Sequence, residues 1–391
     1  MAPLWALLWA LPLASLAARV AVVQSLLERR NALGSEEPPE IEDDPPLPEQ
    51  WEKKIRVLEP LGQGGFGRVF KAQVICEESA ASASALVAMK VMHNQRSSHE
   101  EVEALRDMRG ASWYCAGAVG RPGHVKFEGQ HYALMPFMNK GDLHEVLKNC
   151  YHSHACRCNR QPGEELCWEA LGRPFSLDMV LALFLQVMKG VRAMHEHHIV
   201  HMDLKPENVM LHCTDGHCYA RVVDLGLSCR SGRNCHSLGT VGYIAPEVWK
   251  GVRVGVPAND VFSLGVILYM LVVGHPPPFH GDRDGESTTH YKPHLDRYIR
   301  PWFQRPLGHL MAKMLNLRPL RRIPLERAID ELKGILLNRN LSQEILQMME
   351  HNPEETGAMH PLPQCLEKDA GARKSLTGLL GLLALSALIF Q

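Results

Sequence analysis

Residues 199–210 read IVHMDLKPENVM, and shortly downstream residues 222–226 read VVDLG. The carboxylate of Asp203 can accept a proton from an attacking hydroxyl group, and Lys205 can neutralise negative charge on a transferred group. Asn208 and Asp224 supply the hard oxygen ligands that Mg²⁺ prefers. A chance loop would not combine these four groups at this spacing, so they predict a catalytic loop with a metal site beside it.

A glycine-rich segment precedes this loop in the chain, at residues 61–69 (LGQGGFGRV), with glycines at Gly62, Gly64 and Gly67. Glycine lets backbone N–H groups approach phosphate oxygens closely, because it has no Cβ. The same spacing marks dinucleotide-binding turns, which join a strand to a helix. Here strand-like residues stand on both sides, so the segment favours a phosphate-covering flap between paired strands.

A single lysine, Lys90, closes the apolar segment VAM in the following strand-like run. An ammonium group in apolar surroundings is costly unless it meets an anion. The helical segment HEEVEAL at residues 99–105 offers one, with Glu101 as the chosen partner and Glu103 as the alternative. A lysine on a sheet edge and a glutamate on a solvated helix face would produce the same pattern.

The order of secondary-structure patterns along the chain indicates the fold class. Strand-like runs lie at residues 55–58, 68–74, 86–92 and 131–135, with a helical stretch at 98–108. Later helical patterns lie at residues 177–197, 261–273, 307–315 and 325–337. Strands followed by helices predict an α+β protein with a small sheet lobe and a larger helical lobe.

Taken in order, these residues resemble the eukaryotic protein-kinase family, over residues 55–337. The matching positions are Gly62, Gly64, Gly67, Lys90, Glu101, Asp203, Lys205, Asn208, Asp224, Ala245, Pro246, Glu247, Asp260 and Arg322. The resemblance implies a bilobal α+β fold, with a small antiparallel-sheet N-lobe and a larger, mainly helical C-lobe. It also implies that the protein binds ATP and Mg²⁺ and transfers the γ-phosphoryl group.

The resemblance implies a role for each matched side chain. Asp203 would be the catalytic base and Lys205 would stabilise the moving charge, while Asn208 and Asp224 would hold Mg²⁺. The residues implied to bind nucleotide are Leu61, Gly62, Gly64, Gly67, Val69, Lys90, Glu101, Pro136, Met138 and Asp142. Lys205 and Thr240 resemble the serine/threonine-directed branch, which implies a protein substrate with a Ser or Thr acceptor.

Residues 132–138 (YALMPFM) align with the family's hinge, which holds adenine, and make Met135 the gatekeeper. The family uses the carbonyl of position 136 and the N–H of position 138. Pro136 keeps its carbonyl and lacks only an N–H that the ligand does not need. Asp142 falls where a carboxylate would meet the ribose hydroxyls, and an acid at a helix N-terminus is an equal alternative.

Two departures from the family pattern concern regulation and catalysis. Met202 replaces the arginine that commonly neutralises a phosphorylated activation loop, so switching by that phosphorylation is not expected. A disulfide between Cys229 and Cys235 is predicted to hold the loop instead, with two unpaired thiols as the alternative. Leu225 replaces a phenylalanine, an apolar exchange that should not stop catalysis.

The ends of the chain and its cysteines indicate the compartment. Residues 1–17 have the outline of a secretory signal peptide, and residues 18–54 form an amphipathic segment and an acidic, Pro-rich linker. Eleven cysteines favour disulfides, so we expect the secretory pathway or secretion. In the tail, residues 338–391, the apolar end 376–390 could associate with membrane, be a removed anchor signal or pack as a helix.

Charge and further clusters narrow the partners. The 42 basic residues nearly balance the 43 acidic ones, so no nucleic-acid partner is expected. The insert at residues 149–174 carries four cysteines and is either a stapled surface loop or a partner-docking element. Its Cys-x-Cys spacing favours disulfides over zinc, and the histidines at positions 195–201 favour packing over metal binding.

Secretion, the cysteines, Met202 and Pro136 also make the chain similar to the rhoptry kinases of apicomplexan parasites. Two rival functions remain open. A pseudokinase acting as a regulatory binding module usually lacks Lys90, Asp203 or Asp224, and all three are present. A membrane-tethered interaction protein would depend on residues 375–391 and the cysteine insert.

Overall fold

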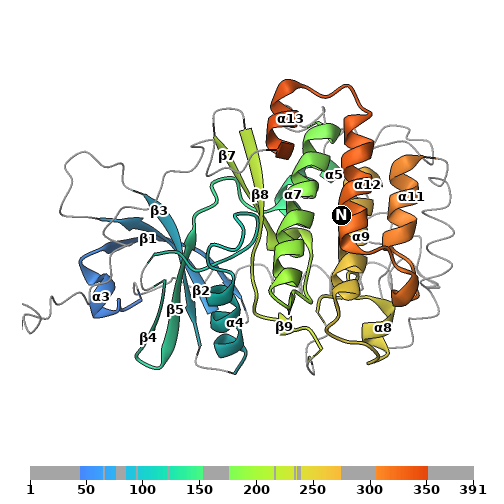
Figure 1. Ribbon diagram of the computed structural model, residues 1–391. Helices are drawn as coiled ribbons and strands as arrows, with labels where there is room; N and C mark the ends of the chain where they lie inside the picture. Colours follow the sequence, from blue (N-terminus) through green and yellow to red (C-terminus); the bar gives the residue numbers. More distant parts are fainter. Residues whose placement is uncertain are drawn as a thin grey trace, which may run out of the picture. The chain divides into compact units, whose positions relative to one another are not determined.

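Five antiparallel strands in the order β1-β2-β3-β5-β4 form the N-terminal part of the computed structural model (Figure 1). The strands are β1 (Ile55–Gly64), β2 (Gly67–Val74), β3 (Leu86–Met92), β4 (His124–Phe127) and β5 (Gln130–Pro136). The structure describes residues 45–64, 67–75, 85–93, 96–120, 123–152, 176–214, 217–232, 235, 239–273 and 305–350. Those from Leu47 onward belong to one unit.

The sheet owes its core to alternating apolar side chains. In β2, Phe70, Ala72 and Val74 are buried while their neighbours are partly exposed, as expected for a strand with one covered face. They pack against Trp51 of the short helix α3 (Glu49–Glu52) and against Tyr132 of β5. The sequence did not predict β4, because its four residues contain one buried apolar side chain and show little alternation.

Helix α4 (Arg96–Asp107) lies beside the sheet and contacts β5 (Figure 1). Val102 and Leu105 are buried on one face of this helix, and Glu101 is buried with them. An acidic side chain on the apolar face of an otherwise amphipathic helix requires a cationic partner. The helix therefore serves to carry one carboxylate towards the sheet.

The C-terminal part is mainly helical. Its helices are α5 (Leu143–His152), α7 (Leu177–Glu196), α8 (Pro246–Trp249), α9 (Pro257–Val273), α11 (Pro306–Met314), α12 (Leu325–Leu337) and α13 (Gln343–Glu350). Ser176 caps α7, because its hydroxyl oxygen accepts the Met179 N–H at 3.2 Å. The predicted helices 177–197, 261–273, 307–315 and 325–337 correspond to α7, α9, α11 and α12.

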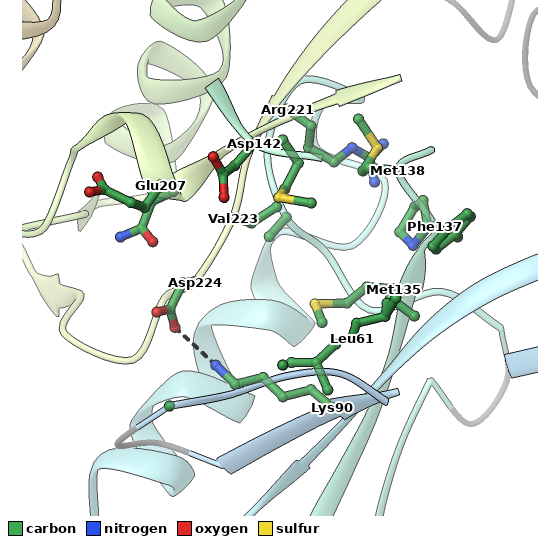
Figure 2. Close-up of a pocket in the computed structure, with 18 of the residues that line it drawn as sticks. Leu61, Lys90, Met135, Phe137, Met138, Asp142, Glu207, Arg221, Val223 and Asp224 are labelled. Atoms are coloured by element: carbon green, nitrogen blue, oxygen red, sulfur yellow. Dashed lines mark hydrogen bonds and ion pairs between the residues drawn. The ribbon is translucent and has the colours of Figure 1, made fainter. Parts of the chain in front are cut away.

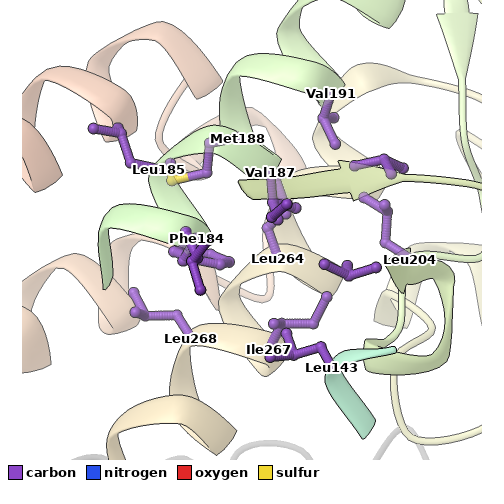
Figure 3. Packing of buried hydrophobic residues seen from close by; sticks show 14 of the residues in the cluster. Leu143, Phe184, Leu185, Val187, Met188, Val191, Leu204, Leu264, Ile267 and Leu268 are labelled. Atoms are coloured by element: carbon purple, nitrogen blue, oxygen red, sulfur yellow. The ribbon is translucent and has the colours of Figure 1, made fainter. Parts of the chain in front are cut away.

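The core of the helical part forms where α7 meets α9 (Figure 3). Phe184, Val187 and Met188 of α7 face Leu264 and Ile267 of α9, and all five side chains are buried. Burying one such side chain stabilises the fold by about 1.5–3 kcal/mol, so this interface gives the C-terminal part a rigid base. Helix α9 is apolar around nearly its whole circumference, as a central helix must be.

Two short antiparallel ladders lie between the sheet and these helices. One pairs β7 (Val209–Thr214) with β8 (His217–Val222), and the other pairs β6 (Ile199–Val200) with β9 (Cys229–Arg230). The 3-10 turn η2 (Pro206–Asn208) precedes β7. These ladders hold residues 199–210 and residues 222–226 next to each other. The bilobal α+β prediction is confirmed.

Several sequence predictions lie outside the described residues. These are the signal peptide, nearly all of the linker, most of the insert at 149–174 and the apolar end of the tail. Among the residues that the structure does describe, none of the helices combines the length and apolarity that crossing a bilayer requires.

Candidate active site

A cavity of about 350 Å³ is lined by the β1–β2 hairpin, β3, the segment after β5 and the β7–β8 hairpin (Figure 2). The predicted nucleotide and metal residues that line it are Leu61, Gly62, Gly64, Gly67, Val69, Lys90, Glu101, Pro136, Met138, Asp142, Asn208 and Asp224. Asp203 adjoins the cavity through Asn208, which hydrogen-bonds to it. Residues from both parts of the chain therefore meet at one site.

Lys90 lies in the middle of the sheet, because its strand β3 is flanked by β2 and β5. Its Nζ lies 2.5 Å from Glu101 Oε1 and 2.9 Å from Asp224 Oδ1. The lysine is 6% exposed and Glu101 is 1% exposed. Glu103 is exposed and faces His99, so the structure selects Glu101 and rules out the sheet-edge interpretation.

The three charges determine one another's protonation. Burial disfavours the charged form of Lys90, but Glu101 and Asp224 outweigh burial and raise the pKa of the lysine. Burial also favours a protonated Asp224, yet the Lys90 ammonium outweighs it and holds the pKa of that carboxyl below its usual range. At neutral pH the site therefore contains an ammonium between two acidic side chains.

The glycine segment forms the hairpin between β1 and β2, with Gly64 opposite Gly67. Gly67 has a φ of 145°, and a Cβ there would lie 2.1 Å from the carbonyl oxygen of Val91 in β3. Only glycine fits so close to that backbone. A Cβ at Gly62 or Gly64 would meet no protein atom within 4 Å, so both glycines border open space over the cavity.

In the catalytic loop, Asp203, Lys205 and Thr240 form a triangle. The hydroxyl of Thr240 donates to Asp203 Oδ1 at 2.6 Å, and Lys205 Nζ donates to the threonine oxygen at 2.9 Å. Lys205 Nζ also lies 3.0 Å from Asp203 Oδ2. In the sequence, Thr240 served only as a marker of substrate class. The structure shows that its hydroxyl also orients the carboxylate of Asp203.

Asn208 and Asp224 offer a donor set that fits Mg²⁺. Asn208 Nδ2 donates to the backbone oxygen of Asp203 at 2.8 Å, which leaves its amide oxygen as the group able to bind a cation. Asp224 remains a carboxylate for the reason given above. One amide oxygen and one carboxylate suit a hard ion that completes its octahedron with water and phosphate oxygens.

A buried aspartate supports the backbone of the catalytic loop. Asp260 of α9 accepts the N–H groups of His201 and Met202 at 2.8 and 3.0 Å, and it also lies 2.8 Å from His195 Nε2. Burial favours the protonated form, but the bond from His195 outweighs it and holds the pKa of Asp260 below its usual range. Because Met202 has a φ of 66°, this anchor holds it in the left-handed region.

His201 links the loop to the strand that leads into Asp224. Its Nε2 lies 3.0 Å from the Val223 oxygen, and its Nδ1 accepts the Asp203 N–H at 3.2 Å. The histidine is fully buried. Its role is structural, as the sequence favoured, and so is the role of His195 beside Asp260.

The apolar end of the cavity contains the predicted hinge residues Met135, Pro136 and Met138. Asp142 lines the cavity, and its Oδ1 accepts the Glu145 N–H at the start of α5, at 2.9 Å, as expected of an acid at a helix N-terminus. Its contact with the ribose stays a prediction. Apolar lining residues that the sequence did not indicate are Ala88, Ala116, Phe137, Met210 and Val223. Ala88 could have been found, since side chains two positions apart on a strand share a face.

Arg221 is a further lining residue that no sequence signal indicated. It lies in β8, three residues before Asp224, and is buried. Its guanidinium stacks over the Trp113 ring, with the carbon 4.4 Å from the ring centroid. Trp113 precedes β4, so the contact joins segments far apart in sequence, which a linear pattern cannot reveal.

The segment after Asp224 is held by a disulfide and an ion pair. The structure pairs Cys229 with Cys235 as predicted, and it also pairs Cys213 with Cys218 across the β7–β8 hairpin. Arg230, between the first two cysteines, donates to Asp107 at the end of α4. The described activation segment is thus tied to the helix that carries Glu101.

Glu247 and Arg322 form a buried, two-pronged ion pair. The guanidinium nitrogens lie 2.6 and 2.9 Å from the two carboxylate oxygens, and Asn259 donates to the carboxylate at 2.8 Å. This pair links α8 to the segment before α12. Both residues were matched from the sequence, and the structure brings them together across 75 positions of chain.

Comparison with known proteins agrees with this geometry. A family model described as the protein kinase domain matches residues 55–332. The chain is 26% identical over 295 residues to an Aurora kinase of Schizosaccharomyces pombe, covering 72% of each chain. It is 28% identical over 269 residues to calcium-dependent protein kinase 14 of Oryza sativa, covering 67% of this chain and 46% of the relative.

A third relative, a SNF-related serine/threonine-protein kinase of Rattus norvegicus, is 36% identical over 154 residues, which are 38% of this chain and 20% of that protein. The chain thus spans less than half the length of two of these three relatives. The family match, by contrast, covers well over half of this chain and both parts of the fold. The chain belongs to the protein kinase family.

Proposed function

We propose that this protein transfers the γ-phosphoryl group of ATP to serine and threonine hydroxyl groups of protein substrates. The observation that carries the proposal is the triangle of Asp203, Lys205 and Thr240. It places a carboxylate, a cation and a substrate-class marker in contact, beside a cavity that contains the Lys90–Glu101 pair.

The side chains divide the reaction between them. Asp203 accepts the proton of the substrate hydroxyl, while the new oxygen–phosphorus bond forms and the bond to the β-phosphate bridge breaks. Lys205 stabilises charge on the moving group. Lys90, tethered by Glu101, positions the α- and β-phosphates. Asn208 and Asp224 would hold Mg²⁺, which would neutralise phosphate charge.

The serine/threonine preference rests on Lys205 and Thr240, the two residues that resemble the serine/threonine-directed branch. The hydroxyl of Thr240 occupies one oxygen of the base and the ammonium of Lys205 approaches the other. The similarity to a SNF-related serine/threonine-protein kinase supports the same substrate class. Among the described residues, Lys90, Asp203 and Asp224, which a pseudokinase usually lacks, are all in place.

The first experiment measures phosphate transfer from radiolabelled ATP with Mg²⁺ to peptides that differ only in carrying Ser, Thr or Tyr. We expect transfer to Ser and Thr, and a loss of about 10²–10⁴-fold in Asp203→Ala, because the general base is removed. Folding of the variant is checked by its circular dichroism spectrum. A folded protein that transfers no phosphate, with or without Asp203, would support the regulatory pseudokinase instead.

We further propose that the protein matures in the secretory pathway. Support comes from the apolar run at residues 4–13 and from the pairing of Cys213 with Cys218 and of Cys229 with Cys235, which is typical of oxidising compartments. Amino-terminal sequencing of the protein from its native cell, with peptide maps made with and without reductant, tests this. An uncleaved amino terminus with free thiols would contradict it.

The likeness to rhoptry kinases and membrane association through the tail at residues 376–390 stay predictions. The apolar end of the tail lies outside the described residues, and so does the signal peptide on which the likeness partly depends. Detergent partitioning of the full chain against one lacking those residues tests the tail, and equal partitioning of both into the aqueous phase would contradict membrane association.

A further inference from the structure

A second cavity, of about 490 Å³, lies away from the nucleotide site, between the end of the activation segment and the turn before α12. One wall comes from α8 and the residues after it, including Val252. The other comes from the 3-10 turn η5 (Pro319–Arg321) and Leu317 before it. We call this cavity the α8–η5 groove.

The rim of the groove is positively charged. Lys250 and Arg253 stand on one wall, and Arg318 and Arg321 on the other. All four side chains are exposed, and within the described part of the chain none has an acidic partner. The one acidic lining residue, Glu247, has its charge matched by Arg322. The net character of the groove is therefore cationic.

The same groove exposes apolar side chains. Leu320 is 77% exposed and Val252 is 54% exposed, which is unusual for residues of this size, and Leu317 is half-buried in the wall. An apolar cleft rimmed by polar groups is the usual surface character of a protein-binding site. The fold itself gains no stability from leaving these apolar side chains in water.

We propose that the α8–η5 groove docks an acidic segment of the protein substrate, with one apolar side chain of that segment held between Val252 and Leu320. Charge complementarity favours acidic residues on either side of the apolar one. This inference rests on the proposed kinase function and names the class of substrate.

The position of the groove favours a substrate as the occupant. Glu247 and Lys250 follow Thr240 by only a few residues, and Thr240 contacts the catalytic base. A substrate segment held in the groove would raise the local concentration of its own acceptor hydroxyl at Asp203 when the peptide between the two is long enough to join them. An extended peptide also fits a concave cleft better than a flat membrane surface does.

Binding is tested with the full chain and a fluorescein-labelled peptide that carries a central leucine flanked by glutamates. We expect saturable binding by fluorescence anisotropy, weakened by salt. Arg318→Glu/Arg321→Glu should weaken it at least about tenfold, because two attractive contacts become repulsive. The matched control is Arg327→Glu, an exposed position on α12 outside the groove, which should leave the affinity unchanged.

Kinetics supply the second readout. For a serine peptide extended by the acidic, leucine-containing sequence, Arg318→Glu/Arg321→Glu should raise KM about tenfold and leave kcat unchanged. The same peptide without the extension should show no change. If the chain proved catalytically inactive, the anisotropy experiment would still decide the docking question, so the two proposals fail separately.

Three outcomes would overturn the proposal. The first is that the labelled peptide does not bind the unsubstituted chain. The second is equal weakening by Arg327→Glu, which would indicate a diffuse charge effect. The third is that the chain sediments with phosphatidylserine vesicles through Arg318 and Arg321 but binds no peptide, which would make the groove a membrane contact.

Discussion

At the residue scale, the choice between two neighbouring glutamates shows how burial selects a functional side chain. Glu101 and Glu103 are two positions apart on α4, so they lie on different faces of the helix. Glu101 is 1% exposed beside Lys90, whereas Glu103 faces solvent. A carboxylate that shares a buried site with a cation restrains that cation, and an exposed one does not.

Replacing Glu101 by glutamine therefore tests this restraint. We expect Glu101→Gln to lower kcat/KM about 10²-fold, because an untethered Lys90 no longer positions the phosphates. Glu103→Gln is the matched control and should stay near the unsubstituted value. Initial rates at several ATP concentrations measure both. Equal losses in the two variants would show that Lys90 does not depend on Glu101.

At the element scale, the pairing of β6 with β9 and the Cys229–Cys235 disulfide hold the start of the activation segment. The disulfide rests on Gly255, where an added Cβ would lie 2.0 Å from Cys235 Sγ. Arg230 adds the contact to Asp107 of α4. In this chain, which has Met202 where the family commonly has an arginine, covalent and ionic contacts thus hold the start of the activation segment.

The packing of the disulfide on Gly255 gives a stability prediction. Gly255 and Gly251 have φ values of 75° and 64°, so alanine is strained at both, but at Gly251 nothing lies within 4 Å. Gly255→Ala should therefore lower the free energy of unfolding by about 1–3 kcal/mol more than Gly251→Ala does. Denaturant unfolding measures this. Reduction of the disulfide or Cys235→Ser should narrow the difference in stability loss between Gly255→Ala and Gly251→Ala. If neither change affects that difference, the disulfide does not pack on Gly255.

The pairing of β4 with β5 predicts a pH effect. His124 Nε2 lies 3.1 Å from His131 Nδ1. Burial, the neighbouring His131, Arg106 and His99 lower the pKa of His124 from 6.5 to about 4. Between these values the unfolded chain binds the proton and the folded chain does not, so stability should fall as the pH decreases from 6.5 towards 4.

Urea unfolding at a series of pH values measures this effect. His124→Gln should flatten the decline between pH 6.5 and 5, a range above most carboxyl titrations. The exposed His309 on α11 is the matched control, and His309→Gln should keep the original slope. Identical slopes in both variants would show that His124 titrates alike in the folded and unfolded chain.

At the scale of the whole molecule, a large core around α7 and α9 supports the helical part and a smaller one supports the sheet. The catalytic loop is attached to this core at Asp260, near the start of α9, which accepts two backbone N–H groups of the loop. Helix α13 extends the same core, because Gln186 and Lys189 of α7 donate to its Met348 and Met349 carbonyls. The catalytic loop is therefore supported by the most deeply buried helices.

The buried Glu247–Arg322 pair holds three segments of the helical part together, so its loss should destabilise the whole helical part. We expect Arg322→Lys to lower the free energy of unfolding by about 3–5 kcal/mol, because an ammonium cannot replace the two-pronged guanidinium and leaves Glu247 poorly paired. Arg327→Lys, at an exposed position on α12, should change it by less than about 0.5 kcal/mol. Similar losses in both would contradict the claim.

The sequence by itself determined the family, four of the five strands of the sheet (β1, β2, β3 and β5), the helices α4, α7, α9, α11 and α12, and the residues of the catalytic loop. Asp203, Lys205 and Asn208 are recognisable because they lie within one short loop whose chemistry requires a fixed spacing. Only the tertiary structure excluded Glu103 as the partner of Lys90, and only it revealed the orienting contact of Thr240, the place of Arg221 in the cavity and the α8–η5 groove. Each depends on which side chains of distant segments become buried together, and periodicity along one segment carries no information about that.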